Sequence, residues 1–195
     1  MPQDTPFIKS CGKGDISEVA SFIVNVKDEP EKRDQLINAA GAGNRTPLHR
    51  AAGGNYGMIV QLLLDNGAIV DAADKVGRTP LLWACIGGHL EPCRLLLSSG
   101  ADPNVATASG MSAMHAAVIG NHVNCVKALI WFGQEKGEEI NLCATDKAGK
   151  TPLELAKDKQ FAAVANILEF KLKHGTVKES DLNDAEAGTV ACVVS

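Results

Sequence analysis

A unit of fixed length recurs in the middle of the chain. The stretch RTPLHRAAGGNYGMIVQLLLDNGAIVDAADKVG, which begins at Arg45, is followed by RTPLLWACIGGHLEPCRLLLSSGADPNVATASG from Arg78. A third copy starts MSAMHAAVIGNHVNCVKALI, so that Thr46, Thr79 and Ser112 are equally spaced along the chain. Self-similarity at a fixed short period is typical of repeat architectures, in which each unit packs only against its neighbours. The sequence therefore predicts a stack of similar units.

Two more copies flank these three, each at a somewhat longer interval. DTPFIKSCGKGDISEVASFI carries Thr5 before the first of the three, and KTPLELAKDKQFAAVANILE carries Thr151 after the last. The extra residues fall in the charged stretches NVKDEPEKRDQ and FGQEKGEEIN, between helices, where repeat stacks tolerate added length. We expect a repeat domain over residues 5–174, with copies that begin near residues 5, 46, 79, 112 and 151.

Each copy has the pattern of two helices and a loop. Thr46 and Thr79 suit an N-cap, and Pro47 and Pro80 follow at the first helical position, where a missing N–H costs nothing. A turn separates this short helix from a more apolar one such as MIVQLLL, and a glycine ends the pair before an extended hairpin loop. Because aromatic residues make up only 4% of the chain and apolar residues 45%, helices packed through small side chains are favoured over a β-sandwich.

The shared pattern, TPLH followed by AA, a turn glycine, an apolar helix and GA, resembles the ankyrin repeat. The resemblance covers residues 5–169 and implies an all-α repeat solenoid of about five stacked ankyrin repeats, each a helix-turn-helix with a hairpin loop. Departures are local: Leu82 and Glu154 replace the usual histidine, and Asn55 and Asn121 stand at the turn glycine. The resemblance further implies that the chain binds another protein through the inner surface of the stack.

Composition and charge argue against several classes of protein. The formal net charge is −4 and no basic block is present, so nucleic acid is not an expected partner. The chain has neither a run of about 18 apolar residues nor the order of a secretory signal, so we expect a cytoplasmic protein. Its six cysteines show no close-paired framework, and in a reducing compartment we expect free thiols.

Candidate chemical groups can be assigned to repeat positions. Two pairs have helical metal-ligand spacing: His89 with Cys93, and His122 with Cys125. Two isolated pairs do not supply four tetrahedral ligands, so no metal site is expected. The resemblance implies a structural role, in hydrogen bonds around the cap and hairpin, for His49 and His115. Once the residues that occupy repeat positions are set aside, the sequence shows no nucleophile with a base, no carboxylate pair and no phosphate loop. We therefore expect no catalytic residues, cofactor or small-molecule substrate.

The resemblance places a partner-binding surface on the first helices and the hairpin tips. The candidates are Trp83, Ile86, Ala116 and Ile119 on the inner surface, with Arg50 and Lys9 to one side, and Lys75, Val76, Ser109 and Lys147 near the tips. An apolar patch with a tryptophan and an arginine has the composition of a binding hot spot. The alternative is that Trp83 only packs against the neighbouring helix.

The last residues carry a separate signal. Residues 175–195 are small and acidic, which predicts a flexible tail, and they finish in CVVS. A cysteine followed by two aliphatic residues and a serine fits the farnesylation pattern, with Cys192 as the acceptor. One lipid gives only reversible membrane attachment, and no second cysteine or polybasic patch lies nearby. The alternative is a chance cysteine in a disordered tail.

Two functional hypotheses remain open, and both predict a monomer without enzymatic activity. The first is an adaptor that brings a protein partner to a cytoplasmic membrane face. The second is a soluble inhibitor or regulatory subunit, in which the tail carries no lipid. The sequence identifies neither the partner nor the membrane.

Overall fold

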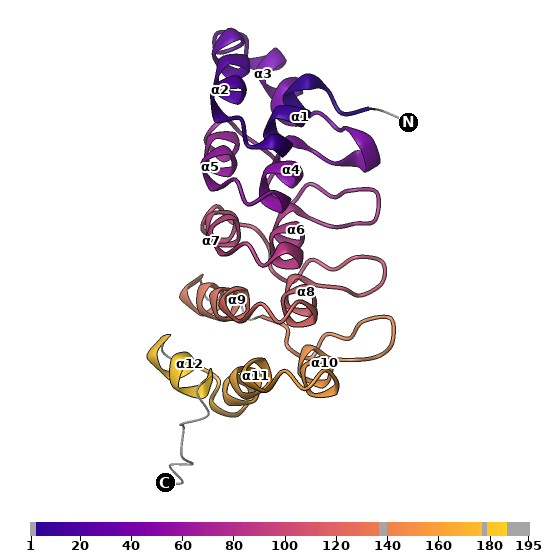
Figure 1. Ribbon diagram of the computed structural model, residues 1–195, viewed down its shortest axis with the longest axis vertical. Helices are drawn as coiled ribbons and strands as arrows, with labels where there is room; N and C mark the ends of the chain where they lie inside the picture. The colour runs from indigo at the N-terminus through magenta and orange to yellow at the C-terminus, as the bar shows by residue number, and fades with distance from the viewer. Residues whose placement is uncertain (1–2, 137–139, 177–178, 187–195) are drawn as a thin grey trace. The chain divides into compact units, whose positions relative to one another are not determined.

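The computed structural model describes residues 3–136, 140–176 and 179–186, and the chain divides into an N-terminal unit, Met1–Asp102, and a C-terminal unit, Pro103–Ser195 (Figure 1). The N-terminal unit contains α1 (Pro6–Lys13), α2 (Ile16–Asn25), α3 (Pro30–Ile37), the 3₁₀ helix η1 (Ala42–Asn44), α4 (Pro47–Gly53), α5 (Gly57–Asp65), α6 (Pro80–Gly87) and α7 (Leu90–Ser98). The C-terminal unit contains α8 (Ala113–Ile119), α9 (Val123–Lys136), α10 (Pro152–Asp158), α11 (Ala162–His174) and α12 (Glu179–Glu186). None of these described helices is long and apolar enough to cross a membrane.

The first helix of each repeat begins where the sequence predicts. The side-chain oxygens of Thr5, Thr79, Ser112 and Thr151 each accept a hydrogen bond from the backbone N–H three residues on. Such a cap satisfies one of the donors that a helix start leaves unpaired, and a proline at the first position removes another. Together with the hairpin loops, these short helices confirm the all-α repeat fold.

The histidine of the TPLH pattern links each cap to the next hairpin within its unit. His49 Nδ1 accepts the backbone N–H of Thr46 at 3.1 Å, and His49 Nε2 lies 2.9 Å from the carbonyl oxygen of Arg78. Since Nδ1 accepts a hydrogen bond, Nε2 must be the ring nitrogen that carries the proton and donates it in a hydrogen bond to Arg78. Burial of the ring lowers the pKa of His49, so the neutral tautomer is the form that holds this link. His115 makes the corresponding contacts, which confirms the structural role of both residues.

Helices of the same kind pack in rows inside each unit. In the N-terminal unit α4 packs against α1 and α6, while α5 packs against α2 and α7 (Figure 1). In the C-terminal unit α8 packs against α10, and α9 against α11. The core lies between the two rows, where large apolar side chains such as Leu63, Leu81, Leu96 and Leu129 are fully buried. Burial of this kind is the main stabilising contribution to a repeat stack.

The hairpin before α6 is held by hydrogen bonds at its tip. Asp74 N–H donates to the carbonyl of Arg78 at 2.9 Å, and Gly77, with φ 84°, donates back to Asp74. The tip also contacts the preceding repeat through the backbone, because Lys75 N–H donates to the carbonyl of Gly43 at 2.8 Å. This hairpin is therefore fixed both by its own turn and by its neighbour.

Two helices lie where the sequence predicted irregular chain. The first charged insertion forms α3, whose Ile37 is buried. In the expected flexible tail, residues 179–186 form α12, which packs on α11 and α9 and buries Leu182 and Ala185. Lys127 Nζ donates to Asn183 at 2.7 Å, a further contact from α9. Two apolar side chains three residues apart share one face of a helix, so α12 docks through this face together with its polar contacts to Lys127.

Candidate functional site

Two guanidinium groups lie over the indole ring of Trp83 on α6. The Cζ atoms of Arg45 and Arg78 are 4.7 Å and 4.4 Å from the ring centroid. Both distances fall inside the range of about 6 Å over which a cation is attracted to the face of an aromatic ring. Because Arg45 and Arg78 each precede a TP pair, the repeat itself brings two equivalent arginines to one tryptophan.

A buried carboxylate fixes this cluster. Asp74 Oδ2 accepts hydrogen bonds from Arg78 Nε at 2.9 Å and Trp83 Nε1 at 3.2 Å. Its Oδ1 accepts the backbone N–H groups of Val76 and Arg78 at the hairpin tip. Burial raises the pKa of Asp74, but the hydrogen bonds from Arg78, Val76 and Trp83 outweigh it and lower the pKa to about 2. Asp74 is therefore ionised at neutral pH and holds both the hairpin tip and the indole in place.

A second ion pair ties the start of the chain to the second repeat. Arg50 on α4 pairs with Asp4, and each side chain is half-buried. The other carboxylate oxygen of Asp4 accepts the backbone N–H of Ala42 at 2.8 Å. Arg50, predicted as a partner contact, thus also serves the structure of the N-terminal unit.

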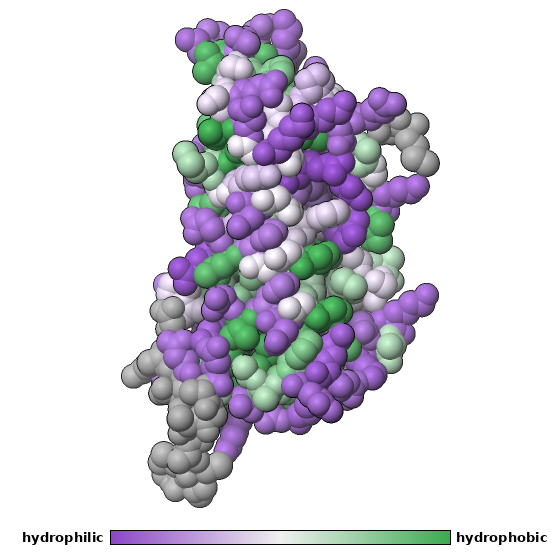
Figure 2. All heavy atoms as spheres, viewed as in Figure 1, coloured by the Kyte–Doolittle hydropathy of each residue, from purple (hydrophilic) through white to green (hydrophobic). Residues whose placement is uncertain are grey.

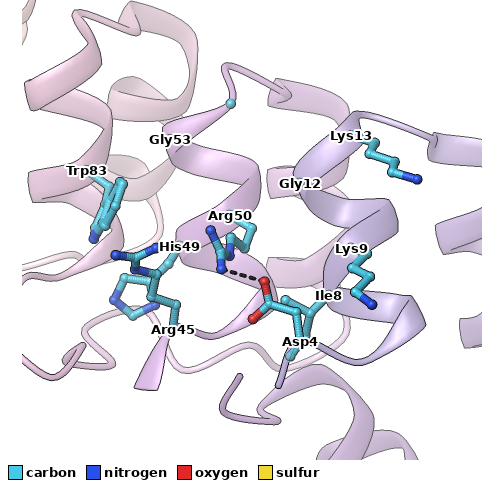
Figure 3. A pocket seen from close by; sticks show the side chains of 11 residues that line it. Asp4, Ile8, Lys9, Gly12, Lys13, Arg45, His49, Arg50, Gly53 and Trp83 are labelled. Atoms are coloured by element: carbon cyan, nitrogen blue, oxygen red, sulfur yellow. Dashed lines mark hydrogen bonds and ion pairs between the residues drawn. The ribbon is translucent and has the colours of Figure 1, made fainter. Parts of the chain in front are cut away.

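Asp4, Arg45, Arg50 and Trp83 border a cavity of about 380 Å³ between α1, α4 and α6. Figure 3 shows Trp83 at one end, Lys9 and Lys13 from α1 at the other, and Arg45 and Arg50 between them. In Figure 2 the surface over α1 and α4 is correspondingly dominated by strongly hydrophilic side chains. The walls carry four cationic side chains and the single carboxylate of Asp4, and the ring of His49 is neutral, so their net charge is three positive charges. The four cations are Lys9, Lys13, Arg45 and Arg50. We call this the basic cavity.

The predicted partner contacts of the N-terminal unit fall into two groups. Arg50 and Trp83 line the basic cavity, whereas Lys75, Val76 and Ile86 lie outside it and are exposed. Trp83 itself is half-buried, and a Cβ atom added to Gly53 on α4 would lie 3.0 Å from its ring. The indole therefore packs closely on the preceding repeat, as the packing interpretation of Trp83 expects. It also borders the cavity, so its role as a partner contact stays a prediction.

In the C-terminal unit one predicted contact is wrong. Ala116 is only 4% exposed, because its methyl group does not project beyond its neighbours on α8, a helix whose residues Ala113–Val118 are all buried. Ile119, at the end of the same helix, is 38% exposed. The carbonyl oxygen of Ser109 accepts the backbone N–H of Lys147 at 2.8 Å, so these two hairpin tips contact each other as those of the N-terminal unit do. Lys147 is exposed and Ser109 is half-buried.

Sequence reasoning did not foresee the basic cavity. Lys9 was placed to one side of the inner surface, but Asp4, Lys13 and Arg45 were not connected with it. One signal was available for the hairpin carboxylate: DKVGR and DKAGK place Asp74 and Asp146 four residues before a cation in two hairpins. The cavity has no such local signature, because its walls come from three repeats.

The other candidate chemical groups belong to the repeat scaffold. No group of three or more His, Cys, Asp or Glu side chains in the described part of the chain could hold a metal ion. His89 Nε2 lies 3.1 Å from the carbonyl oxygen of Gly53, a contact within the scaffold. The five cysteines that the structure describes form no disulfide, and of these only Cys143 is exposed. Burial raises the pKa of the Cys11 thiol to about 12, so it stays protonated. Cys192 lies outside the described residues.

A second cavity, of about 670 Å³, lies in the C-terminal unit between α9, α11 and residues 140–143. Its walls are mainly apolar, with Lys171 as the one cationic side chain among the described residues that line it. It lacks the excess of positive charge found in the basic cavity and holds none of the predicted contacts. The N-terminal unit is therefore the better candidate for the functional site.

Comparison with known proteins identifies the kind of repeat. A family model of ankyrin repeats (3 copies) matches residues 7–107 and again residues 93–178. A search of the curated proteins found no match to the chain.

Proposed function

We propose that the chain, which belongs to the ankyrin-repeat family of protein–protein interaction modules, is a non-catalytic adaptor that a farnesyl group on Cys192 tethers reversibly to a cytoplasmic membrane face. The observation that supports the adaptor role is the cluster of Trp83 with Arg45 and Arg78 at the edge of the basic cavity. Tryptophan and arginine are among the residues most enriched in the centres of protein interfaces.

The proposed contact surface of the N-terminal unit combines this cluster with exposed apolar side chains nearby in the repeat. Arg50 and Trp83 line the cavity, Ile86 on α6 is 42% exposed, and Val76 at the hairpin tip is 55% exposed beside Lys75. A rigid aromatic anchor, charged neighbours and a few exposed aliphatic residues give the mixed character of a protein-binding surface. In the C-terminal unit the proposed contacts are Ile119, Ser109 and Lys147.

A partner-capture experiment with matched variants tests the adaptor role. The tagged full chain is used to isolate proteins from cell extract, and bound proteins are quantified by mass spectrometry. We expect Val76→Asp with Ile86→Asp to lose the specific partner, because a carboxylate at each position opposes burial in an interface. The control, Val24→Asp with Met58→Asp, changes charge equally at residues 59% and 74% exposed on the second helices. Partners lost only from the control variant would place the interface on the second helices instead.

The membrane part of the proposal rests on the sequence CVVS and on the spacer between α12 and Cys192. A prenyltransferase needs the modified segment in extended form, and the six residues that follow Glu186, up to Cys192, span roughly 20 Å when extended. A single lipid gives marginal attachment, so the protein would exchange between membrane and cytosol.

Intact-mass measurement of the protein purified from eukaryotic cells tests this part. Farnesylation at Cys192, loss of the three residues VVS and carboxyl methylation are the expected changes. A chain that retains unmodified VVS, or that extends beyond Ser195, would contradict the tether and favour the soluble inhibitor or regulatory subunit.

A further inference from the structure

The basic cavity has a charge opposite to that of the protein as a whole. Its walls carry a net of three positive charges, whereas the complete chain has a formal charge of −4. Like charges gathered in one recess repel each other, and a structure that merely needed stability would disperse them. Lys9 and Lys13, both exposed, lie one helical turn apart on α1 and so face the same side. The concentration of cations indicates a site for an anion.

Part of the donor capacity in this cavity is unused. The Nε atoms of Arg45 and Arg50 are both buried and have no hydrogen-bond partner. Buried donors without partners are uncommon in folded proteins because their desolvation is not compensated. Trp83 contacts Arg45 through the face of its ring, which attracts the cation but accepts no conventional hydrogen bond from Nε. A carboxylate that enters the cavity would supply acceptors for these two Nε donors.

Asp4 shows how the cavity accommodates a carboxylate. One oxygen of Asp4 pairs with Arg50 and the other accepts the backbone N–H of Ala42. Its side chain neutralises only one of the four cations, which leaves Lys9, Lys13 and Arg45 without a counter-charge in the cavity wall. Gly12 and Gly53 also line the space, and their lack of side chains keeps it open.

We infer that the basic cavity binds glutamate or aspartate side chains of an acidic segment of the protein partner, an inference that rests on the proposed interaction function. The cations are spread along the cavity, from Lys9 and Lys13 at one end to Arg45 beside Trp83 at the other (Figure 3). This arrangement matches several single charges spaced along a peptide. A phosphate group would instead require donors that converge on one point.

An acidic peptide also fits the cavity better than a lipid surface does. Binding to anionic lipids uses clusters of cations on an open surface, each free to reach a headgroup. Here Arg45 and Arg50 are half-buried in a recess and do not stand on an open surface. The indole edge and the aliphatic stems of the lysines can cover the methylene groups of glutamate side chains.

The inference is tested with fluorescein-labelled hexaglutamate, whose binding to the unmodified full chain is followed by fluorescence anisotropy at an ionic strength of about 0.1 M. Reversal of charge in Lys9→Glu with Lys13→Glu should weaken binding by about tenfold, since two exposed cations are turned against the ligand. Gly12→Leu should weaken it too without any change of charge, because Gly12 lines the cavity. Circular dichroism confirms that each variant is folded.

The matched control is Lys27→Glu with Lys32→Glu, which makes the same charge change at exposed residues of the N-terminal unit outside the cavity. It should leave the affinity within about twofold at an ionic strength of about 0.1 M, where charges more than about 10 Å apart are screened. Equal weakening by both double variants, or no saturable binding to the wild type, would overturn the inference. Tighter binding of a phosphoserine peptide would reassign the ligand to phosphate, and cavity-dependent binding of phosphatidylserine vesicles would reassign it to lipid.

This test can be separated from that of the proposed function. If hexaglutamate binds in the cavity and no cellular partner is captured, the cavity assignment stands and the adaptor role is wrong. If a partner is captured with equal affinity by the wild type and by Lys9→Glu with Lys13→Glu, the adaptor role stands and the partner does not use the cavity.

Discussion

Replacing Asp74 by asparagine removes one negative charge from a side chain that accepts four hydrogen bonds and is 1% exposed. Asparagine has the same size, but its amide nitrogen cannot accept a hydrogen bond from Arg78 or Trp83. The substitution therefore tests how much the ionised carboxylate contributes to the hairpin tip and to the position of the indole, with little change in packing.

The magnitude follows from the pKa of Asp74. The folded protein holds this pKa at about 2, below its ordinary value of 3.8. A lowered pKa means that the folded state favours the ionised form, so the contribution is fully present above about pH 4 and is lost as the pH falls through 2. The difference corresponds to about 2 kcal/mol at neutral pH. For a chain of this length the melting temperature of Asp74→Asn should fall by about 4–8 °C.

Urea unfolding followed by far-ultraviolet circular dichroism at several pH values measures this contribution. The difference between wild type and Asp74→Asn should be largest at pH 7 and shrink below pH 4, as the wild-type carboxyl takes up a proton. Asp146→Asn is the matched control, because Asp146 accepts backbone N–H groups, from Ala148 and Lys150, at its own hairpin tip. A difference that does not change with pH, or equal losses in both variants, would refute the role assigned to the Asp74 charge.

Three further predictions concern the core, a turn and the terminus. Leu96→Asp should lower the free energy of unfolding by several kcal/mol, because Leu96 is fully buried and the new carboxylate would have no partner there. Thermal unfolding measures the loss, and an unchanged melting temperature would contradict the packing described for Leu96. Gly14→Ala should be destabilising by about 1 kcal/mol or more, since the φ of Gly14 is 82° and the added Cβ would lie 2.3 Å from Tyr56. In the same unfolding assay the control, Gly12→Ala inside α1, should be neutral or stabilising. Ser195→Leu should redirect the modification of Cys192 from farnesyl to geranylgeranyl, which buries more methylene groups in the membrane. In a vesicle flotation assay this variant should therefore float most strongly, the wild type less and Cys192→Ser not at all. Identical distributions of the three proteins would contradict lipidation.

The elements most readily predicted from sequence are those set by local chemistry. The TP pairs determine where the first helices begin, because both the cap and the proline act within one turn. The paired histidines His49 and His115 also follow from the repeat, since each contacts its own cap and the adjoining hairpin. The exposure of Ile86 and Ile119 agrees with their predicted position on the first helices, although their role in binding stays a prediction.

The repeat pattern in the sequence does not predict properties that depend on the size of a side chain or on the packing of several repeats. Ala116 occupies the same repeat position as Trp83, but an alanine does not reach past its neighbours, so equal register does not give equal exposure. Among the described side chains of α12, Leu182 and Ala185 are the buried apolar ones, too few to produce a recognisable period. The basic cavity requires Asp4, α1, α4 and α6 to meet, and no single stretch of sequence contains that arrangement.

The proposed contact surface can be tested directly through its tryptophan. The chain has two tryptophans, Trp83 in the N-terminal unit and Trp131 on α9 in the C-terminal unit, so a ¹⁵N-labelled sample should show two indole N–H signals, and Trp83→Phe assigns them. On titration with the captured partner the Trp83 signal should shift, because its Nε1–H is bound to Asp74 beside the basic cavity. A complex that forms while the Trp83 signal stays unchanged would contradict the account.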